Sequence, residues 1–139
     1  PAPWRVDFFQ RHVEDDANQA VPGRDFLERC PVAPRMAAVL KAVAEAPPNA
    51  FAGGGYWEAM HGKMAGYFEV RVDRRDRRHY RLFCVLERDG ANLGTGGPSI
   101  VVLTGMEKPF RTTFTDRDYA RVRQLGDEYR SRVPRSVLR

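Results

Sequence analysis

Two neighbouring segments decide the fold: Tyr67-Phe68-Glu69-Val70-Arg71-Val72 and Tyr80-Arg81-Leu82-Phe83-Cys84-Val85-Leu86. In both, every second side chain forms one apolar row, and the row between is mixed. This period of two predicts two β-strands that share one apolar face and one mixed face. The charged segment 73–78 between them predicts a turn, so the two strands form a hairpin.

The register of this hairpin brings two arginines together. If the chain turns about Asp76, Arg71 and Arg81 lie opposite each other on one face. Directly opposed like charges destabilise a hairpin, and a bound anion such as phosphate would relieve the repulsion. The alternative is a purely structural ion-pair scaffold, in which Glu69, diagonal to Arg81, pairs with both arginines. The sequence is compatible with both an anion site and an ion-pair scaffold.

The first half of the chain predicts a strand and two helices. Residues 4–9 alternate partly and are rich in aromatic side chains, which predicts a strand. Residues 10–22 are polar and lead into Pro22-Gly23, which predicts a loop. Residues 24–30 and 35–46 have helical apolar spacing, with Pro31 and Pro34 between them. These two pieces predict a helical hairpin. The Gly-rich residues 49–66 lack the features of a phosphate loop and predict a flexible connection, with Tyr56-Trp57 packed on the sheet.

The second half predicts a buried strand and a last helix. Residues 87–98 are a polar loop, residues 100–103 a strand buried on both faces, and residues 104–113 a second charged connection. Thr115 predicts a helix cap, followed by an apolar stripe and a closing proline: Val122, Leu125, Tyr129, Val133 and Pro134. We therefore expect one α+β domain over residues 1–139, with a small antiparallel-rich sheet, an N-terminal helical hairpin and a C-terminal helix.

Composition narrows the class of protein. The chain has 139 residues, of which 42% are hydrophobic, enough for one modest core. No apolar run reaches the length of a membrane span, so we expect no membrane partner and a cytoplasmic location. Cys30 and Cys84 form no metal-binding pattern and are expected to be buried small hydrophobes in a reducing compartment. A disulfide between them is the alternative.

Charge favours a polyanionic partner. The net charge is +5, and the positive charge lies in the later part of the chain. Arginine greatly outnumbers lysine, and its planar fork suits phosphate groups. A genome rich in G and C would also raise arginine use, and the two explanations carry equal weight.

Three segments in order resemble one protein family. Residues 62–72, Gly-Lys-Met-Ala-Gly-Tyr-Phe-Glu-Val-Arg-Val, are similar to a segment of the HigB-like toxins in the RelE superfamily. Residues 80–83, Tyr-Arg-Leu-Phe, resemble the next strand of those toxins, and residues 102–108, Val-Leu-Thr-Gly-Met-Glu-Lys, their last strand and loop. The likeness covers about Trp57 to Lys108, and more loosely the whole chain.

The resemblance implies a RelE-like fold and a function. The chain would be the toxin of a type II toxin–antitoxin pair, a metal-independent endoribonuclease without cofactors that cleaves mRNA, usually on the ribosome. A neighbouring antitoxin, expected to be of the helix-turn-helix type, would cover the site. Arg71, Arg81 and Lys108 match basic positions that serve cleavage in this family. The position of Glu69 is basic in the best-known sites, so its role here is expected to be structural.

The residues that would act as general acid and general base are harder to assign than the basic positions. Histidine is the usual general acid or base, and His79 lies on the face of Arg81, although a solvent-exposed bystander is the alternative. His61 in the Gly-rich approach is a weaker candidate. Tyr56-Trp57 could stack on a base, although core packing is favoured for Trp57. Tyr119 and Tyr129, at helical spacing, are expected to lie at the edge of the core. We also expect six basic side chains to contact RNA, while a merely solvated turn is the alternative: Lys63, Arg74, Arg75, Arg77, Arg78 and Arg111.

Three functions remain open at this point. The first is an RNA-cleaving toxin. The second is a non-catalytic module of the same fold that binds RNA or an antitoxin. The third is a phage-derived structural or regulatory protein whose basic surface is incidental.

The first testable outcome concerns metals. Because the sequence has no cluster of ligands at metal-binding spacing, cleavage of RNA should persist in EDTA and leave a 2′,3′-cyclic phosphate and a 5′-hydroxyl. End-group analysis of the products by mass spectrometry checks this. Products with a 5′-phosphate, or activity abolished by chelation, would require a different mechanism.

Overall fold

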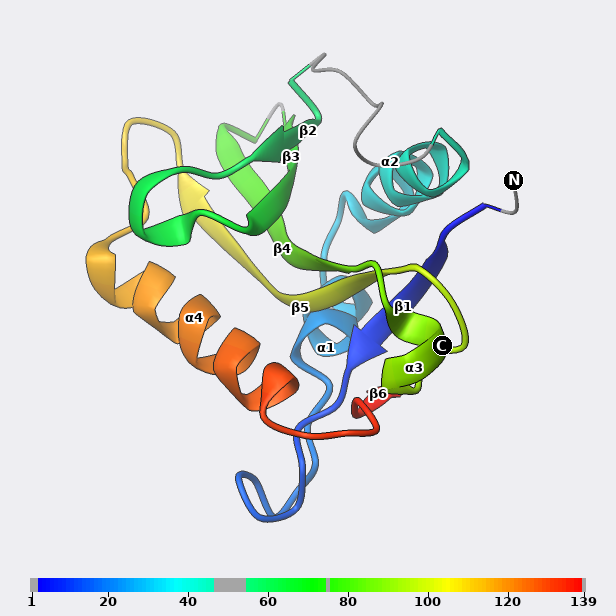
Figure 1. The fold of residues 1–139 in the computed structure, drawn as a ribbon. Helices are drawn as coiled ribbons and strands as arrows, with labels where there is room; N and C mark the ends of the chain where they lie inside the picture. Colours follow the sequence, from blue (N-terminus) through cyan, green and yellow to red (C-terminus); the bar gives the residue numbers. More distant parts are fainter. Residues whose placement is uncertain (1–2, 47–54, 75, 139) are drawn as a thin grey trace.

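A six-stranded sheet forms the centre of the computed structural model, which describes residues 3–46, 55–74 and 76–138 (Figure 1). The strands lie in the order β2-β3-β4-β5-β1-β6, and each neighbouring pair is antiparallel except β1 and β5, which are parallel. The elements in chain order are β1 (Arg5–Phe9), α1 (Pro22–Glu28), α2 (Ala33–Glu45), β2 (Trp57–Ala59), a 3-10 turn (Gly62–Met64), β3 (Tyr67–Arg74), β4 (Arg78–Glu87), α3 (Gly90–Leu93), β5 (Ser99–Pro109), α4 (Asp116–Arg130) and β6 (Val137–Leu138). The prediction of an α+β fold with a mostly antiparallel sheet is confirmed.

The β3–β4 hairpin has the predicted register. Arg71 pairs with Arg81, Asp73 with His79, and Glu69 with Phe83. The turn contains Asp76, whose carboxylate accepts a hydrogen bond from the backbone N–H of Arg78 at 3.2 Å. Period-two alternation was therefore enough to place these two strands against each other.

Helices cover both faces of the sheet, and each face has its own core. On one face, α1 and α2 pack on the strands and bury Met36, Leu40, Val70 and Leu82. On the other face, α4 buries Phe83, Val101, Leu103 and Val122. Figure 1 shows α4 on the opposite side of the sheet from α1 and α2. The hairpin face that we expected to be merely mixed is therefore largely covered.

The two cysteines are both buried and free, so the expected burial is confirmed and they form no disulfide. Burial raises the pKa of the Cys84 thiol and is the largest cause of the raised pKa at Cys30. In the described part of the chain, no helix combines the length and the apolar character needed to cross a membrane.

The helix boundaries in the first half differ from the expected ones. Helix α1 begins at Pro22, not at Arg24, because proline is favoured in the first turn of a helix, where its missing N–H costs nothing. Gly23 is part of that turn, and a Cβ atom there would lie 2.6 Å from a methyl group of Val102. Helix α2 likewise includes Pro34 in its first turn and begins at Ala33.

The prediction of a charged connection over residues 104–113 is wrong for its first half. Strand β5 continues to Pro109, because its pairing with β4 extends as far as Arg78 opposite Pro109. A bulge at Phe83 and Cys84 shifts the register between the two strands, which a period-two pattern does not reveal. Gly105 lies on this part of β5, and a Cβ atom there would overlap the ring of Phe26.

The Gly-rich segment is more ordered than a flexible connection where the structure describes it. Residues 57–59 form the edge strand β2, and Trp57 is buried with its ring stacked on Phe68 at a centroid distance of 5.1 Å. Tyr56, which we expected to pack on the sheet, is 47% exposed. Residues 49–54 of the predicted connection lie outside the described residues. The loop predicted over 87–98 contains the short helix α3.

The last helix has the predicted cap. The Thr115 side chain accepts a hydrogen bond from the N–H of Asp118, and the Asp118 carboxylate accepts one from the N–H of Thr115. Val122, Leu125 and Tyr129 are buried as expected, but Val133 is 66% exposed. The helix ends at Arg130, one turn before Pro134, so Val133 no longer belongs to its buried stripe. The chain then adds the unexpected strand β6 beside β1.

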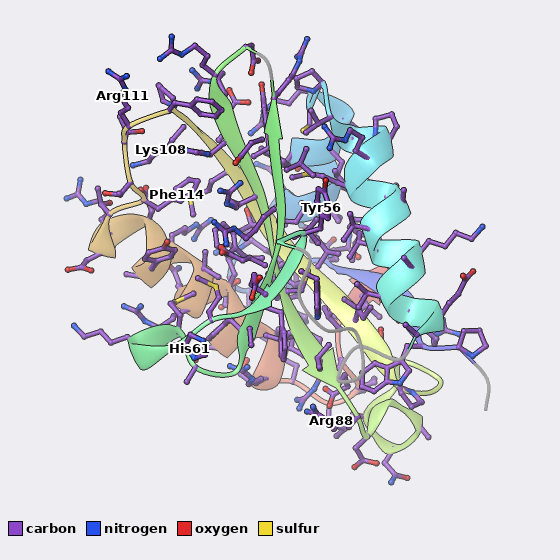
Figure 2. All side chains as sticks on the ribbon, turned by 90° about the horizontal axis from the view of Figure 1, so that it is seen from above. Tyr56, His61, Arg88, Lys108, Arg111 and Phe114 are labelled. Atoms are coloured by element: carbon purple, nitrogen blue, oxygen red, sulfur yellow. The ribbon has the colours of Figure 1, made fainter. Side chains whose placement is uncertain are left out.

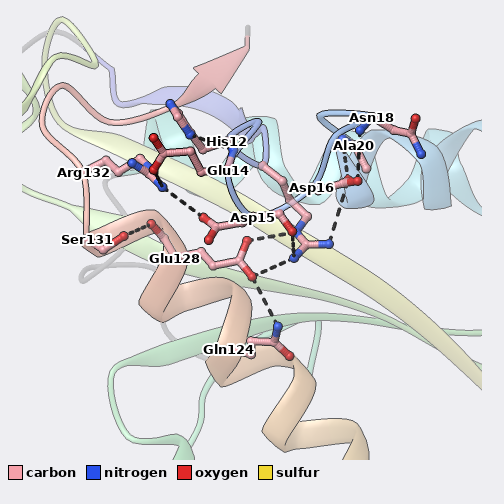
Figure 3. A network of polar contacts seen from close by, with 11 residues as sticks. His12, Glu14, Asp15, Asp16, Asn18, Ala20, Gln124, Glu128, Ser131 and Arg132 are labelled. Carbon is pink, nitrogen blue, oxygen red and sulfur yellow. Dashed lines mark hydrogen bonds and ion pairs between the residues drawn. The ribbon is translucent and has the colours of Figure 1, made fainter.

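Helix α4 is anchored to the loop after β1 by a buried ion pair (Figure 3). The Arg11 guanidinium donates two hydrogen bonds of 2.9 Å to the Glu128 carboxylate, and both side chains are largely buried. Arg11 also lies 3.9 Å from Asp16, whose carboxylate accepts hydrogen bonds from the backbone N–H groups of Asn18 and Ala20. This bidentate geometry fixes the position of α4 over the sheet.

Breaking this anchor should destabilise the protein. Glu128→Gln removes the charge from a largely buried pair and should lower the free energy of unfolding by about 1–2 kcal/mol. Glu14→Gln is the matched control, because Glu14 makes an exposed ion pair with Arg132 at 3.3 Å and its loss should leave stability unchanged. Urea denaturation followed by circular dichroism measures both. Equal effects of the two changes would contradict the anchoring role of Glu128.

Candidate functional site

A row of charged side chains faces α4 from the hairpin. Glu69, Arg71 and Asp73 occupy alternate positions of β3, and His79 and Arg81 occupy alternate positions of β4 on the same face. Together with α4 and the segment before it, these strands enclose two hollows. The hollows share Glu69, Arg71 and Tyr119, so these three residues lie at their junction.

The larger hollow has a volume of about 500 Å³ and opens beside the 3-10 turn. Its walls combine apolar side chains with both signs of charge: Glu58, Met60, His61, Lys63, Met64, Asp116 and Arg123, besides the shared residues. The smaller hollow, of about 250 Å³, adds His79, Arg81 and residues 112–114 from the segment before α4. Volumes of this size suit a nucleotide-sized group rather than a macromolecule.

Arg71 is the accessible cation at the junction. Its side chain is 42% exposed, and its Nε lies 3.5 Å from the nearer carboxylate oxygen of Glu69. That Nε is buried and has no hydrogen-bond partner among the described residues. A buried N–H donor without a partner is costly, and an anion that entered the hollow would satisfy it. The guanidinium is therefore a donor group suited to a phosphate.

Glu69 is the carboxyl group beside this cation. Its side chain is only 15% exposed, and burial raises its pKa, although the charges of Arg71 and Arg81 act in the opposite direction. A carboxylate whose pKa lies nearer to neutrality is a better proton acceptor than an ordinary one. Burial also raises the pKa of the nearby Tyr119 hydroxyl. Glu69 is thus a largely buried carboxyl with a raised pKa, beside an arginine that lines the same hollows.

Arg81 is buried and internally paired. Only 6% of the residue is exposed, and its Nη1 donates hydrogen bonds of 2.9 Å to the Asp73 carboxylate and to the carbonyl oxygen of Tyr80. The same Asp73 oxygen lies 2.8 Å from His79 Nδ1. Burial acts to raise the pKa of Asp73, but the hydrogen bonds to His79 and Arg81 outweigh it and the pKa is lowered. Asp73 therefore connects Arg81 to His79.

His79 is held by this carboxylate and by an aromatic ring. Its imidazole lies 4.6 Å from the Phe110 ring, between centroids, and it lines the smaller hollow with Arg71 and Arg81. A carboxylate beside Nδ1 orients the ring. The structure thus brings together three of the four predicted catalytic residues.

Lys108, the fourth predicted residue, lies outside the two hollows. Its ammonium group is 2.7 Å from the Asp118 carboxylate and donates a hydrogen bond of 3.0 Å to the carbonyl oxygen of Thr113. The hydrogen bond from Lys108 is the largest cause of the lowered pKa of Asp118. This ion pair secures the segment between β5 and α4, which forms one wall of the smaller hollow.

The predicted RNA-contacting side chains divide into two places. Lys63 lines the larger hollow. Arg74, Arg77, Arg78 and Arg111 lie at one end of the sheet, because the turn before β4 and the turn after β5 are joined there. The N–H of Phe110 donates a hydrogen bond of 2.7 Å to the carbonyl oxygen of Arg77. Arg74 and Arg78 are paired there with Asp76 and Glu107, while Arg75 lies outside the described residues. Figure 2 shows Arg111 and Lys108 at that end and Arg88 at the opposite end.

Sequence reasoning missed part of the site. Glu69 was expected to be structural, and Tyr119 was interpreted as a residue at the edge of the core. Tyr119 precedes the buried Val122 by three residues, so helical spacing places it on the sheet-facing side of α4, but not over Arg71. Arg123 was not singled out, and its Nη1 lies 3.4 Å from the sulfur of Met64.

Comparison with known proteins adds no family or relative. No protein-family model, curated protein or solved structure matches the chain. Among the described residues there is also no group of three or more His, Cys, Asp or Glu side chains that could hold a metal ion.

Two carboxyl groups of the site should affect stability in opposite directions. The pKa of Glu69 is raised on folding, so its contribution to stability is complete below the ordinary value of 4.5 and is lost as pH rises through the raised pKa. Asp73 has a lowered pKa, so its contribution is present above the ordinary value of 3.8 and is lost as pH falls through the lowered pKa. At pH 7, Glu69→Gln should stabilise the protein and Asp73→Asn should destabilise it.

The measurement is urea denaturation of both variants at pH 7 and near pH 4. The gain in Glu69→Gln should disappear near pH 4, where the wild-type carboxyl is also neutral. A Glu69→Gln protein that is less stable than the wild type at pH 7 would show that the ion pair with Arg71 outweighs the burial of the charge.

Proposed function

We propose that the chain is an RNA-cleaving toxin of a type II toxin–antitoxin pair, a metal-independent endoribonuclease that acts on mRNA. One observation carries the proposal: the partly unsatisfied guanidinium of Arg71 and the largely buried carboxyl of Glu69, with its raised pKa, meet at one hollow. The resemblance of three segments to the RelE/HigB toxins supports the same function.

The groups of the hollow suffice for cleavage without a metal. The Glu69 carboxylate accepts the proton of a ribose 2′-hydroxyl, whose oxygen attacks the adjacent phosphorus. The new bond joins phosphorus to the 2′-oxygen, and the bond to the 5′-oxygen breaks. Protonated His79 gives its proton to that leaving oxygen, and Asp73 holds the ring. The products are a 2′,3′-cyclic phosphate and a 5′-hydroxyl, so atoms and charges balance.

The arginines supply the electrostatic stabilisation of the transition state. Arg71 donates to the phosphate oxygens, on which negative charge increases in the transition state. Arg81 contributes a second positive charge to the hollow from a buried position, and it fixes Asp73. Rigid strands carry both side chains, which keeps their positions precise during the reaction. The arginines at the turn end of the sheet contact RNA backbone farther away, as on a ribosome-bound message.

A toxin of this kind needs a partner that blocks it. An antitoxin segment with acidic side chains would complement the basic groups around the hollows and exclude RNA. The proposed partners are therefore a cognate antitoxin of the helix-turn-helix type and the mRNA on the ribosome.

A non-catalytic RNA- or antitoxin-binding module is the second candidate. It is favoured by the ion pairs of Arg81 with Asp73 and of Lys108 with Asp118, which hold two predicted catalytic cations internally. The two functions differ in one respect that is easily measured. The module binds RNA or antitoxin without producing new RNA ends.

Variants of the two central residues test the chemistry. Arg71→Ala should lower the rate of RNA cleavage by roughly 10²-fold or more, because a transition-state contact is lost. Glu69→Gln should lower it by about 10²–10⁴-fold, because the proton acceptor is lost. The wild-type rate should rise with pH through the raised pKa of Glu69 and so begin to rise at higher pH than for an ordinary glutamate.

The readout is cleavage of a purified single-stranded mRNA fragment under single-turnover conditions, with growth arrest on expression in bacteria as a second measure. Arg88→Ala is the control for Arg71→Ala, since Arg88 lies at the opposite end of the sheet (Figure 2). Glu14→Gln is the control for Glu69→Gln. Wild-type rates in both site variants would place the active site elsewhere.

A further inference from the structure

A third hollow lies on the other side of Arg71. It has a volume of about 360 Å³ and is lined by Arg35, Gly55, Tyr56, Arg71 and Asp73. The carbonyl oxygen of Tyr56 accepts a hydrogen bond of 2.9 Å from the backbone N–H of Arg71, so Tyr56 sits beside Arg71 at the start of β2. Figure 2 shows Tyr56 between the hairpin and α2. Arg71 thus lines all three hollows.

Tyr56 is an exposed aromatic ring on a fixed backbone. It is 47% exposed. The next residue, Trp57, is buried and stacked on Phe68, which fixes the backbone that carries the Tyr56 ring. An exposed aromatic ring beside arginines is the arrangement with which proteins bind unpaired bases of single-stranded nucleic acid.

The charge of this hollow favours a phosphate. Arg35 is exposed in the first turn of α2 and forms no ion pair with any described residue. Arg71 provides the second cation. The one acid in the lining, Asp73, is already bonded to His79 and Arg81. Arg35 is therefore not neutralised by a described acid. Arg71 lies 3.5 Å from Glu69, which does not line this hollow, and its Nε still has no hydrogen-bond partner among the described residues. Each arginine can donate to phosphate oxygens.

We propose that this hollow binds the nucleotide next to the cleaved phosphate in single-stranded RNA, with its base stacked on Tyr56 and its phosphate held by Arg35. The proposal rests on the proposed function, because Arg71 joins this hollow to the site of cleavage. A single strand that follows the three hollows runs around the edge of the sheet at the start of β2, from the face covered by α4 toward α2. The strand must be unpaired there, since the base leaves its neighbours to stack on the ring.

The experiment uses binding, so that it is independent of catalysis. The probe is a fluorescent RNA decamer with 2′-O-methyl riboses, which cannot be cleaved, and a matched series in which one base at a time is removed. For the wild-type protein, removal of one base should weaken binding by about tenfold, as expected for loss of one stacked base. Tyr56→Ala should bind the intact decamer about tenfold more weakly, and removal of the same base should then have no further effect.

Three more variants complete the test. Tyr56→Phe keeps the ring and should bind as the wild type does. Arg35→Ala should weaken binding and reduce its salt dependence by about one phosphate contact. Arg88→Ala, at the opposite end of the sheet, should change neither the affinity for the decamer nor its salt dependence. Thermal melting confirms that each variant is folded, which exposed positions such as Tyr56 and Arg35 should permit.

The outcomes separate this proposal from the proposed function. If the wild-type protein binds and cleaves RNA while Tyr56→Ala binds the decamer normally, or still responds to removal of the base, the stacking site is wrong and the proposed function stands. If Tyr56→Phe binds as weakly as Tyr56→Ala, the ring does not stack on a base. A wild-type protein that neither binds the decamer nor cleaves RNA overturns both.

Discussion

The register of the β3–β4 hairpin sets Arg71 directly opposite Arg81, and the rest of the site is arranged around this pair of like charges. The sheet tolerates the pair because each arginine has its own acid on the same face. Arg81 is bonded to Asp73 on one side, and Arg71 lies beside Glu69 on the other. The two acids are not equivalent. Asp73 is hydrogen-bonded to both His79 and Arg81 through one carboxylate oxygen, whereas Glu69 is 3.5 Å from its partner and more deeply buried. The difference leaves one arginine structural and the other accessible.

Helix α4 covers this row of charged side chains and encloses the hollows beside it. Without a helix over it, the face would be a solvated surface, and its ion pairs would be weak. With Tyr119 over the row, Glu69 is shielded from water, which raises its pKa, and the hollows acquire a second wall. The position of α4 depends on distant contacts: its capping box at Thr115, and the Arg11–Glu128 pair near its other end. The acidic N-terminal loop thereby contributes to a site that it does not touch.

The parts of the fold and of the site that could be predicted from the sequence are those held by interactions between residues close in the chain. The hairpin and its register follow from period-two alternation, which is local, so Arg71 and Arg81 were placed correctly. Strand β5 was cut short at Leu103 because residues 104–109 are held by pairing with β4 rather than by an apolar pattern. Glu69 and Tyr119 were undervalued for the same reason, since their importance depends on where α4 packs. Tyr56 was expected to be covered, and only the structure shows its ring exposed beside Arg71.

An arginine-rich composition by itself says little about which arginines would make the RNA contacts that we propose, whereas the structure shows which of them are already paired with acids. Arg11, Arg81 and Arg135 each donate to carboxylates while largely shielded from solvent, and removing them would leave an acid unpaired. Arg35 and Arg71 are at least partly exposed at hollows, and Arg71 retains a donor that no described residue satisfies. A ligand with phosphate groups gains most from the second kind, because it satisfies donors without breaking an internal pair. The RNA surface that we propose is therefore defined less by where positive charge is concentrated than by where the fold leaves arginine donors exposed or unsatisfied.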